Sequence, residues 1–268
     1  MKKQMLSAVL VTLSCFIHTV ANAQTNIGPA PLSDADPALI NDLVAANHIL
    51  AEQGIVDGFG HVSVRHDKIK THFLLSRSMA PALVTSKDIM EFDENCEPIN
   101  SEGRQPYLER FIHCELYRGR PEIQSVIHNH SPAVIPFGVA NVPLRSIYHM
   151  SAFLGDSTPV FEIRTAGGEE TDMLIRSRSL GAAMAAAMGN HPVLLIRGHG
   201  STVVGNSLPQ AVFRAVYTEV NAKLEAEALR LGNVTFLNAK EAQNAAATND
   251  GQVGRTWALW KMRVEPSK

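Results

Sequence analysis

The sequence predicts a single α/β domain, because helix-like and strand-like patterns alternate along the chain and no boundary divides it. Hydrophobic residues make up 45% of the 268-residue chain, which is enough to form a substantial core. We find no internal repeat and no linker within residues 35–235. We therefore place one domain at 35–235, after a loose lead-in at 24–34 and before a C-terminal extension at 236–268.

Charge and hydropathy argue against two kinds of partner. The chain has 24 Lys plus Arg and 26 Asp plus Glu, with a formal net charge of −2 and no basic block. Binding to a phosphate backbone requires clustered positive charge, so nucleic acid is not an expected partner. The only long apolar stretch lies at the N-terminus, so no internal membrane span is expected.

The N-terminal residues have the pattern of a secretory signal peptide. Two lysines precede a mostly apolar run at residues 5–20, which an Ala-Asn-Ala site follows. We expect cleavage after Ala23, a periplasmic or secreted mature protein, and no membrane association after cleavage. The alternatives are an anchor, for which the run is short and contains His18, and a lipoprotein signal at Cys15, whose neighbours match poorly.

The expected helices and strands follow from apolar spacing. Asp36 and Pro37 supply the N-cap and first-turn proline of a helix that Gly54 ends. Further helices are expected at 108–118, after Ser131, at 174–188 and at 212–231, and strands at 62–65, 72–76, 89–93, 125–130 and 193–196. The mature chain keeps Cys96, in a polar turn, and Cys114, in a helical pattern, and the sequence leaves open whether they form a disulfide.

Histidines gather where strands are expected to end. His128 and His130 are two residues apart on a strand pattern, so both rings project from one face. His199 lies in a Gly-His-Gly turn after another apolar strand. Glu109 and His113 are four residues apart, which places them on one face of the expected helix. The carboxylate is a candidate fourth ligand, a general base, or both in turn.

A metal site explains this pattern better than chance does. Any one of these histidines alone is more readily interpreted as an ordinary polar residue at a strand end. Together they suit a divalent ion, and zinc is the expected one, with Mn²⁺, Co²⁺ or Fe²⁺ as alternatives. We interpret the remaining histidines as ordinary polar residues, namely His18, His48, His66, His72 and His191.

The motifs around these residues resemble the class II aldolase/adducin family. They are Ser-Val-Ile-His-Asn-His-Ser-Pro at 125–132, Leu-Leu-Ile-Arg-Gly-His-Gly at 194–200 and Gly-His-Val-Ser-Val-Arg at 60–65. The resemblance covers roughly residues 38–235. It implies a central mixed, mostly antiparallel sheet flanked by helices, and a homotetramer with active sites at subunit interfaces.

The same resemblance implies individual roles. His128, His130 and His199 correspond to the metal-binding histidines of the family. Glu109 corresponds to the carboxylate that binds the metal in the empty site and moves protons during turnover. The aldolases of the family have a catalytic tyrosine directly before a methionine. Here His149 occupies that position and Tyr148 precedes it, so both are candidate proton donors.

Departures from the sugar-phosphate members concern the positions that hold phosphate. Those members have Gly-Asn, Thr-Gly and Ser-Ser, where this chain has Gly60-His61, Ser78-Met79 and Tyr107-Leu108. Met79 and Leu108 offer no side-chain donor and add apolar bulk, so a dianionic phosphate would lose solvation there without gaining a partner. The expected substrate-binding residues are Gly60, His61, Ser76, Arg77 and Ser78. The guanidinium of Arg77 suits a carboxylate, although a solvated surface arginine is an equal interpretation.

The sequence therefore predicts a metal-dependent carbon–carbon lyase for a small, non-phosphorylated keto- or hydroxy-acid. Decarboxylation through a metal-stabilised enolate is the favoured reaction, because family members that resemble this chain include decarboxylases. An aldolase or epimerase acting on a sugar or sugar phosphate is the second candidate. The third and fourth candidates are a non-haem iron oxygenase and a non-catalytic adducin-like domain.

Overall fold

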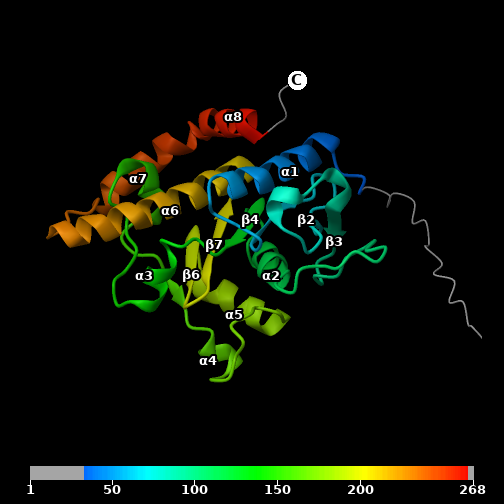
Figure 1. Ribbon diagram of the computed structural model, residues 1–268, viewed down its shortest axis with the longest axis horizontal. Coiled ribbons are helices and arrows are strands. Elements are labelled where there is room, and N and C mark those ends of the chain that lie inside the picture. The colour runs from blue at the N-terminus through cyan, green and yellow to red at the C-terminus, as the bar shows by residue number, and fades with distance from the viewer. Residues whose placement is uncertain (1–32, 265–268) are drawn as a thin grey trace, which may run out of the picture.

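A seven-stranded sheet forms the centre of the computed structural model, which describes residues 33–264 (Figure 1). The predicted signal peptide and most of the lead-in lie outside the described residues. The strands follow the order β3-β2-β1-β4-β7-β6-β5. Their bounds are β1 His61–Arg65, β2 Phe73–Ser76, β3 Ile89–Phe92, β4 Ser125–Asn129, β5 Val160–Phe161, β6 Val193–Ile196 and β7 Gly200–Gly205.

The strand pairing confirms the predicted fold class. Neighbouring strands are antiparallel except for β5 and β6, which run parallel, so the sheet is mixed and mostly antiparallel. Strand β4 is central and pairs with β1 on one side and β7 on the other. This pairing sets His61 of β1 directly opposite His128 of β4.

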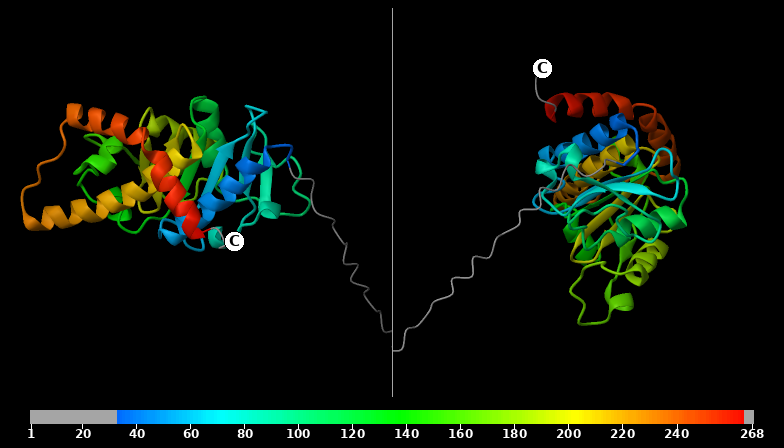
Figure 2. Two further views of the ribbon diagram at one scale, coloured as in Figure 1. Left: turned by 90° about the horizontal axis from the view of Figure 1, so that it is seen from above. Right: turned by 90° about the vertical axis from the view of Figure 1, so that its right-hand side faces the viewer.

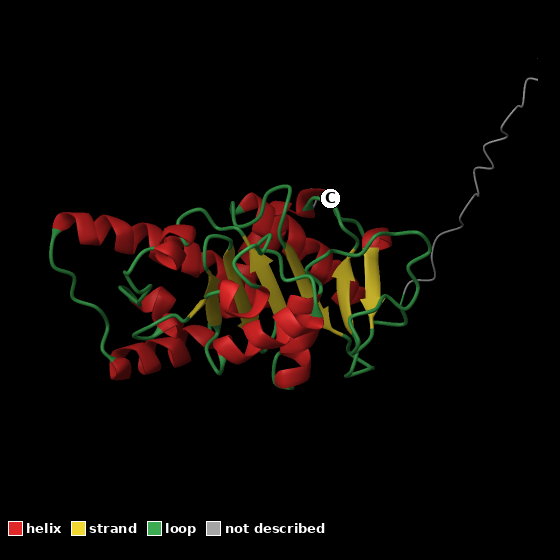
Figure 3. Cartoon of the chain, turned by 90° about the horizontal axis from the view of Figure 1, so that it is seen from below, coloured by secondary structure: helices red, strands yellow, loops and turns green. Residues whose placement is uncertain are grey.

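Helices cover both faces of the sheet (Figures 1 and 3). One face packs against α1, α6 and α8, and the other against α2 and α5. Val126 and Ile127 belong to opposite cores, as the alternation of side chains along a strand requires. The helices are α1 Pro37–Glu52, α2 Phe111–Gly119, α3 Ile135–Val139, α4 Arg164–Gly167, α5 Arg178–Met188, α6 Leu208–Leu231, α7 Ala239–Asp250 and α8 Val253–Val264.

Several expected boundaries differ from the structure. Helix α2 begins at Phe111 rather than at residue 108, and α5 begins at Arg178 rather than at residue 174, because Ser177 caps it. Strands β5 and β7 and helices α7 and α8 were not expected.

Strand β7 lacks a strong apolar run and is bounded by Gly200 and Gly205. Both glycines are required there, because a Cβ would lie 2.0 Å from the Asn129 carbonyl oxygen and 2.5 Å from the Ala211 nitrogen, respectively.

A disulfide links Cys96, after β3, to Cys114 in α2, with the two Cα atoms 5.5 Å apart. The sequence left this pairing open. The bond closes the segment that contains Tyr107 and Glu109, so it fastens the start of α2 to the β3 edge of the sheet.

The C-terminal extension is part of the fold. Helix α7 packs against the short 3₁₀ helix at His149–Leu154, and α8 packs against α1 and α6. Figure 2 shows α6 and α7 reaching beyond the sheet and joined there by a loop. Val253 and Trp260 of α8 are buried in the core that also includes α1. Within residues 33–264, no helix combines the length and apolar character that crossing a membrane requires.

Candidate active site

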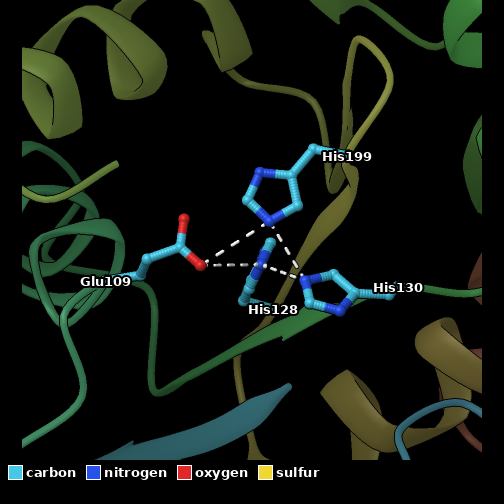
Figure 4. A group of neighbouring side chains, drawn as sticks. All are labelled: Glu109, His128, His130 and His199. Carbon is cyan, nitrogen blue, oxygen red and sulfur yellow. Dashed lines mark hydrogen bonds and ion pairs between the residues drawn. The ribbon is translucent and has the colours of Figure 1, made fainter. Parts of the chain in front are cut away.

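Four side chains converge at the end of β4 (Figure 4). His128 is the penultimate residue of β4, and His130 follows the strand. His199 lies in the turn between β6 and β7, which the antiparallel pairing brings beside β4. Glu109 reaches them from the turn before α2. All four predicted metal-ligating residues therefore lie together.

Their ligating atoms face a common point. The Nε2 atom of His130 lies 3.2 Å from Nε2 of His128 and 3.0 Å from Nε2 of His199. The Oε2 atom of Glu109 lies 3.5 Å from Nε2 of His128 and 3.6 Å from Nε2 of His199. Four ligands at zinc bond lengths of about 2.0–2.1 Å, placed at the corners of a tetrahedron, are about 3.3 Å apart. The cluster therefore fits a small divalent ion.

Backbone carbonyls orient two of the imidazoles. Nδ1 of His128 lies 3.2 Å from the carbonyl oxygen of Ser201, and Nδ1 of His199 lies 2.9 Å from that of Met173. Each Nδ1–H donates to its carbonyl, which leaves Nε2 with a free lone pair directed at the cluster. Burial, with a further contribution from the neighbouring His199, holds the pKa of His128 well below its ordinary value, so the ring is neutral. Neutral imidazoles with free Nε2 atoms are the form that binds a metal.

Glu109 is held in a different way. Its Oε1 accepts a hydrogen bond from the backbone N–H of Ile175 at 2.9 Å, which leaves Oε2 for the cluster. Burial raises the pKa of Glu109, although the nearby His199 opposes the shift. The expectation that Glu109 and His113 share one helical face is wrong, because Glu109 precedes the first residue of α2. The ring of His113 instead forms a hydrogen bond with the ring of His61.

A second group with metal-ligating side chains does not fit a metal. It comprises Asp34, His66 and Glu91. Nδ1 of His66 accepts hydrogen bonds from two backbone N–H groups, at 3.0 and 3.1 Å. A neutral ring must then carry its proton on Nε2, which faces Ser33 and Asp34 as a donor. His66 is therefore a hydrogen-bonding residue, as the sequence interpretation expected.

A pocket of about 260 Å³ adjoins the ligand cluster at Glu109 and His130. The predicted substrate-binding residues Gly60, His61 and Ser78 line it. The remaining lining is mostly apolar and consists of Gly58, Phe59, Met79, Ala80, Tyr107, Leu108 and Leu174. Gly60 has a φ of +90°, and a Cβ there would lie 2.6 Å from Val56, so glycine is required at this turn.

Ser76 and Arg77 do not line this pocket. The hydroxyl of Ser76 is buried against Tyr107, at 3.3 Å. The expectation that Arg77 binds the substrate is not met within this chain, because its Nε donates to Asp88 at 2.7 Å. Burial opposes ionisation of Asp88, but hydrogen bonds from Arg77 and Thr85 outweigh it and hold the pKa of Asp88 below its ordinary value.

Neither Tyr148 nor His149 lines the pocket or belongs to the ligand cluster of the same chain. His149 is exposed at the start of the 3₁₀ helix, and its carbonyl accepts a hydrogen bond from Asn249 of α7. The Tyr148 hydroxyl is buried, with no hydrogen-bond partner among the described residues, and burial raises its pKa. A single chain therefore does not bring these two residues to the pocket.

Sequence reasoning also missed residues that shape the site. The backbone groups of Met173 and Ile175 orient His199 and Glu109, but they lie in a loop without a motif. Phe59 stands 70% exposed at the pocket, and its only sequence signal was the pair of flanking glycines. The contact between His61 and His113 joins residues 52 positions apart, so only the strand pairing reveals it.

Comparisons with known proteins agree with this architecture. The family model for the class II aldolase and adducin N-terminal domain matches residues 41–226. Decarboxylase tropJ from Talaromyces stipitatus is 36% identical over 249 residues, 84% of this chain and 94% of that protein. The 3,4-dihydroxyphthalate decarboxylase from Terrabacter sp. is 35% identical over 199 residues, covering 70% of this chain and 80% of that protein.

Solved structures share the fold. The L-fuculose 1-phosphate aldolase from Glaciozyma antarctica superposes with a TM-score of 0.70 at 22% identity, over 85% of this chain and 88% of that one. An aldolase II superfamily protein from Pseudomonas syringae superposes with a TM-score of 0.74 at 20% identity. The superposition covers 88% of this chain and 95% of that one. The chain belongs to the class II aldolase and adducin family. With its His₃Glu cluster in place, it is a lyase of that family.

Proposed function

We propose that this protein is a metal-dependent decarboxylase of a small aromatic hydroxy-acid. The observation that carries the proposal is the pocket lining beside the ligand cluster. Where sugar-phosphate members of the family place small and hydroxyl-bearing residues, this pocket presents His61, Met79, Tyr107 and Leu108. A mostly apolar lining suits an aromatic ring better than a dianionic phosphate. The names of the two related decarboxylases support the same reaction class.

The ligand set suits a divalent ion held by His128, His130, His199 and Glu109, with zinc as the expected ion and Mn²⁺, Co²⁺ or Fe²⁺ as alternatives. When bound, such an ion supplies a Lewis acid that stabilises the negative charge left as carbon dioxide departs. Among the described residues, Glu109 is the only carboxylate that lines the pocket, so it is the acid–base group that lies beside a bound substrate. We assign Glu109 the transfer of the proton that replaces the lost carboxylate.

Gly60, His61 and Ser78 are the proposed substrate contacts. The Gly60 turn brings backbone close to the pocket, and the neighbouring His61 ring packs against Tyr107 in a tilted arrangement with centroids 4.5 Å apart. Phe59 and Leu108 are exposed beside them, so an aromatic substrate would bury their apolar surface.

The assembly and the cellular location are further parts of the proposal. A homotetramer is expected from the family resemblance, and a neighbouring subunit would be the source of Tyr148 and His149 at each site. Export is supported by the signal-like N-terminus and by the Cys96–Cys114 disulfide, because disulfides persist in oxidising compartments. Light scattering and cell fractionation test these two points.

A substrate screen tests the proposed reaction. The zinc-, manganese- and iron-loaded proteins are each incubated with 3,4-dihydroxyphthalate and a panel of hydroxy- and keto-acids, and carbon dioxide is measured. We expect release from an aromatic hydroxy-acid without oxygen consumption. Efficient cleavage of L-fuculose 1-phosphate or epimerisation of L-ribulose 5-phosphate would return the protein to the sugar-phosphate branch. Oxygen uptake would indicate an oxygenase.

A further inference from the structure

A buried chain of hydrogen bonds leads from the pocket into the protein behind His61. Nδ1 of His61 lies 2.7 Å from Nε2 of His113, and Nδ1 of His113 lies 2.6 Å from the Ser63 hydroxyl. The Ser63 hydroxyl lies 2.8 Å from the Tyr117 hydroxyl. All four side chains are buried, and the packing of α2 against β1 brings them together.

The direction of these hydrogen bonds follows from their endpoint. The Tyr117 hydroxyl finds no proton acceptor other than Ser63 within residues 33–264. It must therefore donate to Ser63, whose single proton then goes to Nδ1 of His113. Burial lowers the pKa of His113 to about 3, so the ring is neutral and its remaining proton is on Nε2. That N–H donates to Nδ1 of His61.

The consequence for His61 is a single tautomer. Because Nδ1 accepts a hydrogen bond, a neutral His61 carries its proton on Nε2. That nitrogen has no partner in the described part of the chain, and the residue lines the pocket. The reverse orientation would leave the Tyr117 proton buried without an acceptor and would present a lone pair to the pocket, which repels a carboxylate oxygen.

We propose that His61 is a preoriented N–H donor to a carboxylate oxygen of the substrate, and that His113, Ser63 and Tyr117 are positioning residues that fix its tautomer. The inference rests on the proposed function and deepens it, because it assigns a donor to the carboxylate substrate. The ring also packs in a tilted arrangement between two neighbouring rings, with centroids 4.5 Å from Tyr107 and 5.2 Å from His128.

Ser63→Ala is the sharpest test, because it removes one hydroxyl from the middle of the chain of hydrogen bonds. Ser125→Ala is its matched control. Ser125 is equally buried on the adjacent strand β4, but its hydroxyl donates to the Ser63 carbonyl and lies outside that chain of hydrogen bonds. In zinc-loaded protein, ¹⁵N NMR of the imidazole nitrogens should show His61 protonated on Nε2 in the wild type and in Ser125→Ala. In Ser63→Ala, the two tautomers should mix.

Binding of phthalate, an aromatic dicarboxylate that lacks the hydroxyls, provides the second readout. Loss of a fixed donor to a carboxylate should weaken phthalate binding by about tenfold in Ser63→Ala and by much less in Ser125→Ala, with zinc content unchanged in both. His113→Gln, whose amide N–H can replace the donor to His61, should retain more affinity than His113→Leu.

Two results would overturn the proposal. One is a wild-type His61 protonated on Nδ1, and the other is a Ser63→Ala variant that matches Ser125→Ala in tautomer and in phthalate affinity. Neither readout depends on turnover. If the protein is a decarboxylase but fails the tautomer and phthalate tests, the proposed function stands and only the role of His61 is wrong. If the protein passes both tests but lacks decarboxylase activity, the proposed function is wrong and the role of His61 as a carboxylate donor stands.

Discussion

The backbone N–H of Ile175 holds Oε1 of Glu109 at 2.9 Å and thereby directs the other carboxylate oxygen at the histidine cluster. The loop before α5 thus determines which oxygen of Glu109 faces the metal ligands. A glutamine at residue 109 can keep this contact through its carbonyl oxygen.

Glu109→Gln should therefore fold and still bind metal, although more weakly, while turnover falls. Removing the charge and the basicity of a general acid–base group costs roughly 10²–10⁴-fold in rate. The measurement is kcat on the substrate that the screen identifies, with metal content determined in parallel. Glu97→Gln, which changes an exposed glutamate, is the control. Near-normal turnover of Glu109→Gln would assign the proton transfer to another residue.

His128→Ala, His130→Ala and His199→Ala should each lose most of the bound metal while the fold persists. Each substitution removes one Nε2 ligand from a set in which His130 lies 3.2 Å from His128 and 3.0 Å from His199. Elemental analysis and circular dichroism of the purified variants check this expectation. His191→Ala, at an exposed histidine, should keep wild-type metal content. Full occupancy in all three ligand variants would contradict the assignment.

Arg77→Ala should affect stability more than substrate binding, because Arg77 pairs with Asp88 and does not line the pocket. We expect KM to change by less than about threefold, and a loss of stability of about 1 kcal/mol from one partly exposed pair. Steady-state kinetics and thermal unfolding measure the two effects. Arg176→Ala removes a more exposed ion pair and is the comparison. A large rise in KM confined to Arg77→Ala would restore its predicted contact with the substrate.

Glu225→Gln should change how stability depends on pH. Burial raises the pKa of Glu225 to about 7 in the folded state, from 4.5. Since the folded state holds this proton more tightly than the unfolded state, the wild-type protein loses stability as pH rises from about 4.5 to about 7. The variant lacks this loss, which amounts to roughly 2–3 kcal/mol. Chemical unfolding at pH 5 and pH 8 measures the difference, and Glu227→Gln, exposed on the same helix, should behave as the wild type.

Local patterns predicted the parts of the fold and site that depend on neighbouring residues. The alternation in β4 placed His128 and His130 on one face, and the Gly-His-Gly turn placed His199 at a strand end. These signals need only the period of a strand and the flexibility of glycine. The family resemblance added the sheet type.

The remaining features of the fold and the site depend on contacts between residues far apart in the sequence, which local patterns do not reveal. Whether Arg77 faces the pocket depends on Asp88 in the following turn, and the partner of His113 is set by the register of β1. Strand β7 was missed because the residues at its two ends are glycines, which allow neighbouring backbone to approach closely. A strand is recognised in a sequence by apolar residues, and these ends have none. Helices α7 and α8 were missed because a tail that is polar and rich in alanine shows little apolar periodicity, whereas α8 is held by tertiary packing of Trp260.

The packing of α8 on α1 has a consequence for the order in which the molecule is built. The ribosome synthesises a chain from its N-terminus. Helix α1 therefore emerges about two hundred residues before Val253 and Trp260, which lie in the same core. Until those residues arrive, the apolar face of α1 has no cover on that side. The nascent protein therefore completes its core only when its last helix has been synthesised, and until then the side of α1 that contacts α8 stays exposed.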